Sequence, residues 1–241
     1  YAALKAALAT TPRASKAKRD LIRINMDRWR WLQRDLGKFY LLTNVPEFQL
    51  RLTVDNAIIR SYRTIVGKPG KTATPQLAEQ VEAVVFNPTW TVPQSIIVGE
   101  GLGRELLANP ASAARRGYKV SRGANGYVSV VPQPGPTNSL GLMKIDMPNP
   151  HAIYLHDTPN RSLFNATFRA MSHGCVRTER AQELGMTMAM LGADLTPEVA
   201  VQHALSGKYT KVAMTKTFPV YITYFTMAQD ITGKLSSFND I

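Results

Sequence analysis

Alternating hydrophobic and polar positions in the first third of the chain predict β-strands. These runs cover residues 39–44, 48–54, 57–66 and 81–86, and they are rich in β-branched and aromatic residues. Asp55 and Asn56 separate two of the runs, and such a pair is typical of a hairpin turn. Further strands are expected at 138–147, 153–155 and 218–226. The chain is therefore expected to have a mainly β core.

Apolar residues at helical intervals predict a few helices around this core. One covers residues 21–32, with Ile22, Asn25 and Trp29 on one face. Another starts with Thr178 as its N-cap and ends at Gly192, and a third covers 196–205. Residues 1–20 are polar and basic, and we expect them to be partly helical and loosely attached.

Residues 94–137 have a different character, with short helical and strand-like pieces that end in a proline-rich segment. This pattern predicts an insertion that packs loosely on the β core. Long insertions of this kind are commonly lids or binding loops. A surface excursion without a function fits the composition equally well.

Composition places the chain among globular proteins and favours an anionic partner. It has 241 residues, of which 44% are hydrophobic and 19% charged, and a formal net charge of +12. A positive surface favours anionic partners. No nucleic-acid-binding motif is present, so no nucleic-acid partner is expected. No apolar run is long enough to cross a bilayer, and the first residues do not form a signal peptide.

The candidate chemistry centres on Cys175, the single cysteine of the chain. One cysteine excludes an intrachain disulfide and a multi-thiolate metal site. A lone cysteine is most often a small buried hydrophobe. Here it follows Ser172, His173 and Gly174, and His156 lies 175 − 156 = 19 positions earlier. Glycine and the two histidines favour a catalytic nucleophile.

A cysteine nucleophile needs a nearby base or a lowered pKa, because the thiolate is the reactive form. His156 is the first candidate for the base, and His173 is the competing one. The side chain of Asp157 or a backbone carbonyl would orient His156. The dipole of the helix expected from Thr178 would favour the thiolate. Gly174 would leave backbone amides free to stabilise an oxyanion, so acyl transfer through a thioester is predicted.

The remaining candidates have weaker support. His151 and His203 are expected to be structural or exposed, and the histidine spacing does not favour a metal site. Arg177 either binds a substrate carboxylate or is a surface residue, with even support for each. Ser172 and His173 would orient the substrate or the loop.

Two ordered segments resemble the signature of the L,D-transpeptidases, the YkuD-type catalytic domain. These are Tyr154-Leu155-His156-Asp157 and Ser172-His173-Gly174-Cys175-Val176-Arg177. Residues 25–31, 90–93, 138–141 and 156–159 are similar to the larger Gram-negative type with a substrate-capping insertion. The resemblance covers roughly residues 21–240. Arg177 departs from it, since many members have asparagine there.

The resemblance implies an α+β, mainly β fold with a YkuD-like sandwich or barrel core and a few helices. Residues 1–36 would be a helical scaffold remnant, and residues 37–241 the catalytic domain with a capping insertion at about 94–137. The protein would be periplasmic, with its signal sequence absent from this chain. No cofactor, metal or membrane span is implied.

The resemblance also implies an activity. Cys175 would attack a peptidoglycan tetrapeptide stem at the carbonyl of its diaminopimelate, with His156 as proton acceptor and donor. The backbone of His173, Gly174 and Cys175 would form the oxyanion hole. Substrate-binding or supporting residues would be Tyr154, Asp157, Ser172, Arg177, Asn138 and Trp90. The acceptor would be the diaminopimelate amine of a second stem, and carbapenems would acylate the cysteine.

Two alternatives stay open from the sequence. An L,D-carboxypeptidase would use water as the acceptor at the same site. A non-catalytic peptidoglycan-binding module would keep Cys175 as a buried relic. A papain-like enzyme is disfavoured, because its cysteine precedes its histidine.

Overall fold

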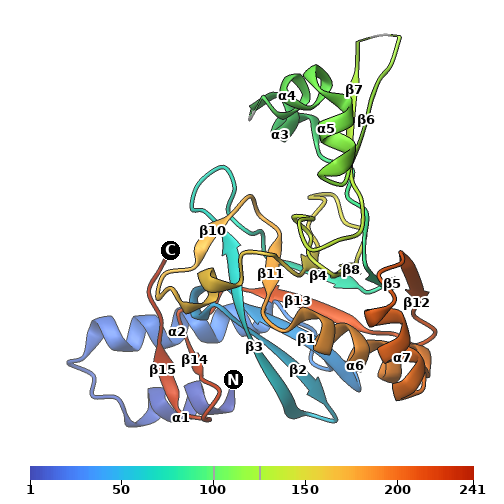
Figure 1. Cartoon of the computed structure of the whole chain (residues 1–241). Coiled ribbons are helices and arrows are strands. Elements are labelled where there is room, and N and C mark those ends of the chain that lie inside the picture. Colours follow the sequence, from blue (N-terminus) through green and yellow to red (C-terminus); the bar gives the residue numbers. More distant parts are fainter. Residues whose placement is uncertain (100, 125) are drawn as a thin grey trace.

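The computed structural model describes residues 1–99, 101–124 and 126–241 (Figure 1). Positions 100 and 125 belong to the expected insertion at 94–137 and lie outside the described residues. A curled mixed sheet forms the body of the molecule, with helices packed against it. The prediction of a mainly β, α+β fold is thus confirmed.

An 11-stranded sheet makes up this body. Its strands are β1 (Phe39–Asn44), β2 (Gln49–Val54), β3 (Ala57–Gly67), β4 (Leu77–Gln80), β5 (Ala83–Phe86), β8 (Met143–Asp146), β9 (Leu155–His156), β10 (Ala170–Ser172), β11 (Val176–Thr178), β12 (Thr210–Ala213) and β13 (Pro219–Thr223). They are ordered β12-β5-β8-β9-β11-β3-β2-β1-β13-β4, with β10 beside β3. The predicted hairpin joins β2 and β3, and Asp55 and Asn56 have φ values of 47° and 63° there, as a tight hairpin turn requires.

Two helices cover one side of this sheet, α6 (Ala181–Ala193) and α7 (Pro197–Leu205). Leu184 and Met188 of α6 are fully buried in the main core. The prediction that this helix starts with Thr178 as its N-cap is wrong. Thr178 is the last residue of β11 and pairs with Thr64 of β3. Thr178 therefore hydrogen-bonds to a strand that is distant in the sequence and does not begin the helix.

The N-terminal helices, α1 (Ala2–Thr10) and α2 (Lys16–Arg30), pack against the end of the chain. The end of the chain forms the hairpin of β14 (Met227–Gln229) and β15 (Leu235–Ser237). Leu4 and Ile22 are buried there, and the ring of Trp29 stacks on Phe225 at 4.6 Å. The expectation that residues 1–20 are loosely attached is therefore wrong, although the domain boundary at 36/37 stays a prediction.

A small separate unit projects from the sheet, and we call it the cap (residues 92–132; Figure 1). It contains α3 (Gln94–Gly99), α4 (Leu102–Ala108), α5 (Pro110–Arg115), β6 (Tyr118–Arg122) and β7 (Val128–Pro132). Its own apolar core includes Ile97, Leu106 and Val130. Two short 3-10 helices, η1 (Val45–Glu47) and η2 (Arg161–Asn165), complete the elements of the described chain.

Candidate active site

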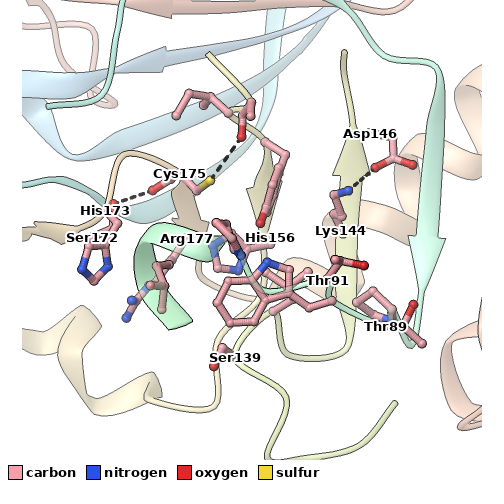
Figure 2. Close-up of a pocket in the computed structure, with 18 of the residues that line it drawn as sticks. Thr89, Thr91, Ser139, Lys144, Asp146, His156, Ser172, His173, Cys175 and Arg177 are labelled. Carbon is pink, nitrogen blue, oxygen red and sulfur yellow. Dashed lines mark hydrogen bonds and ion pairs between the residues drawn. The ribbon is translucent and has the colours of Figure 1, made fainter. Parts of the chain in front are cut away.

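A cleft of about 990 Å³ lies between the sheet and the base of the cap (Figure 2). Trp90 and Ile96 line it from the cap side. The sheet contributes side chains from neighbouring strands and the loops beside them; these are Lys144, Asp146, Tyr154, His156, Cys175 and Arg177. The cleft thus gathers the residues that the sequence singled out around Cys175.

Strand pairing explains why these side chains meet. The parallel pair β9 and β11 aligns His156 with Arg177, and the antiparallel pair β8 and β9 aligns Lys144 with His156. Successive side chains of a strand point to opposite faces. Cys175 is two residues before Arg177, so both face the cleft. The sheet therefore places His156 diagonally next to Cys175 and between two cations.

His156 is held as a neutral base. The residue is 5% exposed, and its Nδ1 lies 2.5 Å from the backbone carbonyl oxygen of Asp157. If Nδ1 donates to that carbonyl, Nε2 carries no proton and can act as an acceptor. Burial lowers the pKa of His156 to about 3, the charge of Arg177 adds to this effect, and a backbone hydrogen bond to Leu140 opposes it. The imidazole is therefore unprotonated at neutral pH.

The Asp157 side chain does not orient His156. Its Oδ2 accepts a hydrogen bond from the backbone of Leu142 at 2.9 Å and pairs with Arg161 at 3.3 Å. Of the two orienting groups that the sequence left open, the backbone carbonyl is the one within hydrogen-bonding distance.

The Cys175 thiol is protonated at rest. Burial raises its pKa, although Tyr154 and the charges of Lys144 and Arg177 act in the opposite direction. The expected helix dipole is missing, because α6 begins at Ala181, after the intervening strand β11. Among the described residues, the sulfur is hydrogen-bonded to the Ala152 carbonyl at 3.9 Å and interacts with Tyr154, not with the His156 ring. Catalytic hydrogen bonds commonly tighten only once substrate is bound.

The turn before Cys175 is fixed by side chains that bond the backbone. Ser172 Oγ donates to the Cys175 carbonyl at 2.6 Å (Figure 2). It also accepts from the Gly174 amide at 3.1 Å. Thr74 Oγ1 donates to the Gly174 carbonyl at 2.7 Å. Gly174 has a φ of 118°, which only glycine adopts readily. Ser172 therefore fixes the conformation of the turn that carries Cys175.

The hydrogen bonds of this turn change which backbone amides can form the oxyanion hole. The Gly174 amide is already bonded to Ser172, so the expectation that it is free is wrong. The amides of His173 and Cys175 have no acceptor among the described residues. They are the backbone donors that remain for a developing oxyanion.

Asn138 and Trp90 lie at the base of the cap. Asn138 is 1% exposed, and its amide nitrogen donates to the carbonyls of Pro88 at 2.8 Å and Gln133 at 3.1 Å. It therefore joins the two segments that lead into and out of the cap, and it does not line the cleft. Trp90 does line the cleft and interacts with the hydroxyl of Tyr154.

The other histidines divide between the cleft and the surface. His173 and His151 are exposed at the cleft, and His203 lies on α7 beside Phe86. Within residues 1–99, 101–124 and 126–241, no cluster of three or more His, Cys, Asp or Glu could hold a metal ion. No helix in the same ranges is long and apolar enough to span a membrane.

Two contributors to the site were missed in the sequence. Lys144 faces the cleft beside His156, with its Nζ 4.5 Å from the centroid of the Tyr154 ring. Thr74 comes from the loop after β3, 100 positions before Gly174. Only the register of the folded sheet could have identified them.

Comparisons with known proteins show which family the chain resembles. Residues 38–190 match the family model of the YkuD L,D-transpeptidase catalytic domain. A Haemophilus influenzae protein that carries a provisional L,D-transpeptidase name is 31% identical over 201 residues, which cover 77% of this chain and 40% of that protein. The chain thus spans less than half the length of this curated relative.

Solved structures give lower similarity. An L,D-transpeptidase from Mycobacterium smegmatis has 16% identity and a TM-score of 0.37, covering 77% of this chain and 58% of that one. The catalytic domain of an E. faecium L,D-transpeptidase acylated by ertapenem has 13% identity and a TM-score of 0.41, covering 78% and 98%.

Proposed function

The chain belongs to the YkuD family of L,D-transpeptidase catalytic domains, and on that premise we propose that it cross-links peptidoglycan stems through a thioester on Cys175. The donor is a tetrapeptide stem, and the acceptor is the side-chain amine of a second diaminopimelate. The site lies in the periplasm, where this anionic polymer meets a chain of net charge +12.

The observation that carries this proposal is the pairing of β9 with β11. It brings a neutral His156 and the Cys175 thiol to one face of the sheet, inside one cleft. A neutral imidazole is the form that can accept a proton from a thiol. A buried relic would not need a buried histidine oriented by a backbone carbonyl beside it.

The acylation step follows from these groups. Nε2 of His156 takes the proton of Cys175 as the sulfur forms a bond to the donor carbonyl. The amides of Cys175 and His173 stabilise the oxyanion, a contribution of about 3–4 kcal/mol per donor in related chemistry. The carbon–nitrogen bond then breaks, and the proton on His156 passes to the departing amine of D-Ala.

The second step reverses the proton transfers. The acceptor amine attacks the thioester, His156 takes its proton, and the thiol leaves with a proton returned from His156. With water in place of the amine, the product would be a shortened stem, and the activity would be that of an L,D-carboxypeptidase.

The proposal is tested with purified disaccharide-tetrapeptide and mass spectrometry of the products. Wild type is expected to release D-Ala and form dimers joined between two diaminopimelates, whereas Cys175→Ala forms none. His203→Ala, a change on α7 away from the cleft, is the matched control and should keep its activity. Tripeptide without dimer would identify the carboxypeptidase, and binding without any turnover would identify the binding module.

A further inference from the structure

Arg177 differs from the other arginines that are buried or half-buried in the sheet region. Arg51 pairs with Glu47, Arg63 pairs with Glu179, and Arg169 donates to backbone carbonyls of Thr64, Ala166 and Phe48. Arg177 has neither a carboxylate nor a carbonyl partner among the described residues, and its Nε is buried without an acceptor. A half-buried guanidinium without an acceptor is costly unless a ligand supplies one.

The unpaired guanidinium of Arg177 faces the cleft. It lines the cleft two residues after Cys175 on the same strand face. In Figure 2, Arg177 and His173 lie on one side of Cys175, and the Lys144–Asp146 pair lies on the other. The cation at that other end is already neutralised, because Lys144 Nζ is 2.6 Å from Asp146 Oδ1. The free positive charge is therefore on the Arg177 side.

We propose that Arg177 binds the terminal carboxylate of the residue that leaves the donor stem, and so selects donors with a single residue after the scissile bond. This inference rests on the proposed function. Burial without a counter-charge also lowers the pKa of Arg177. A bound carboxylate would supply the missing partner in the paired geometry that guanidinium favours.

Distances along the chain are consistent with this assignment. The backbones of Cys175 and Arg177 are roughly 7 Å apart, because two residues of a strand span about that distance. With the scissile carbonyl at Cys175, a single leaving residue extends by about 3.8 Å from one Cα to the next. The arginine side chain can close the remaining gap. A donor with one more residue would move its carboxylate by about 3.5 Å and lose this pairing.

The test measures binding by titration calorimetry in a Cys175→Ala background, where no turnover occurs. The ligands are the tetrapeptide stem and the same stem ending in D-alaninamide. Loss of the terminal charge is expected to weaken binding about 10–100-fold, as for a hydrogen bond to a charged group. Adding Arg177→Gln should weaken binding of the acid stem by the same factor and leave binding of the amide stem unchanged.

Matched variants separate a local role from general electrostatics and from misfolding. Lys216→Gln removes a positive charge that pairs with Asp194 outside the cleft, so it should leave the ratio of acid to amide binding unchanged. Arg177→Lys keeps the charge but loses the two-pronged geometry, and it should recover only part of the preference.

Three outcomes would overturn the proposal. The first is equal binding of acid and amide stems in the Cys175→Ala background. The second is a uniform loss with Arg177→Gln for both stems. The third is a loss seen only when the side-chain carboxylate of the third residue is amidated, which would assign Arg177 to that group instead. Since the assay needs no catalysis, failure of the proposed transpeptidation would appear separately, as absence of D-Ala release by wild type.

Discussion

At the scale of single residues, the site depends on backbone groups as much as on side chains. The carbonyl of Asp157 orients His156, and the hydroxyls of Ser172 and Thr74 hold the turn at Gly174. The sequence motif predicted His156 and Cys175, because their residue types and order carry the chemistry. It could not predict which group orients the histidine or that Thr74 joins the turn, since both depend on the folded backbone.

The electrostatics of the pair predict a distinctive pH profile for acylation. His156 stays neutral down to its lowered pKa of about 3, and burial keeps the Cys175 thiol protonated. The neutral pair is therefore the dominant state between these two limits. We expect the carbapenem acylation rate to be level from about pH 5 to about pH 8 and to rise only as the thiol ionises.

Stopped-flow measurement of acylation against pH checks this expectation. His203→Ala serves as the control, because its imidazole lies on α7 outside the cleft. A rate that falls by half near pH 6.5, the ordinary pKa of histidine, would contradict the neutral buried base.

At the scale of elements, strand pairing decides where elements begin and end more than the local propensity of the residues does. Residues 39–66 and the hairpin at Asp55 and Asn56 were predictable, because alternation and turn chemistry are local signals. The short strands β9, β10 and β11 were not recognised in full, since their pairing partners lie far away in the sequence. The same long-range pairing explains why α6 starts at Ala181, whereas the sequence predicted a start at Thr178.

The cap is anchored at its base, so a single change there is expected to loosen it. Asn138→Ala would leave the carbonyls of Pro88 and Gln133 without their donor, at a cost of about 1–3 kcal/mol. Hydrogen exchange should speed up in residues 92–132 while β1 to β3 stay protected. Use of the tetrapeptide should fall more than acylation by a small carbapenem.

Asn109→Ala is a suitable control within the cap, because its side chain accepts from Ser112 at the start of α5. It should affect that helix alone. Equal acceleration of exchange across the whole chain in Asn138→Ala would show that Asn138 supports the global fold instead of the cap.

At the scale of the whole molecule, the two ends of the chain meet. The helices α1 and α2 pack on the β14–β15 hairpin, with Asn25 Nδ2 donating to Thr226 Oγ1 at 3.1 Å. The amphipathic face of α2 was visible in the sequence, but its partner near the C-terminus was not. The mainly β class followed from composition and alternation, whereas the strand order required the structure.

The most direct test of the account is the intact mass of the protein after incubation with a carbapenem. Wild type is expected to gain the mass of one inhibitor molecule, because the neutral His156 can activate the Cys175 thiol for acyl transfer. Cys175→Ala should gain none while keeping its thermal unfolding midpoint. An adduct on both proteins, or on neither under conditions in which the ligand binds, would contradict Cys175 as the nucleophile.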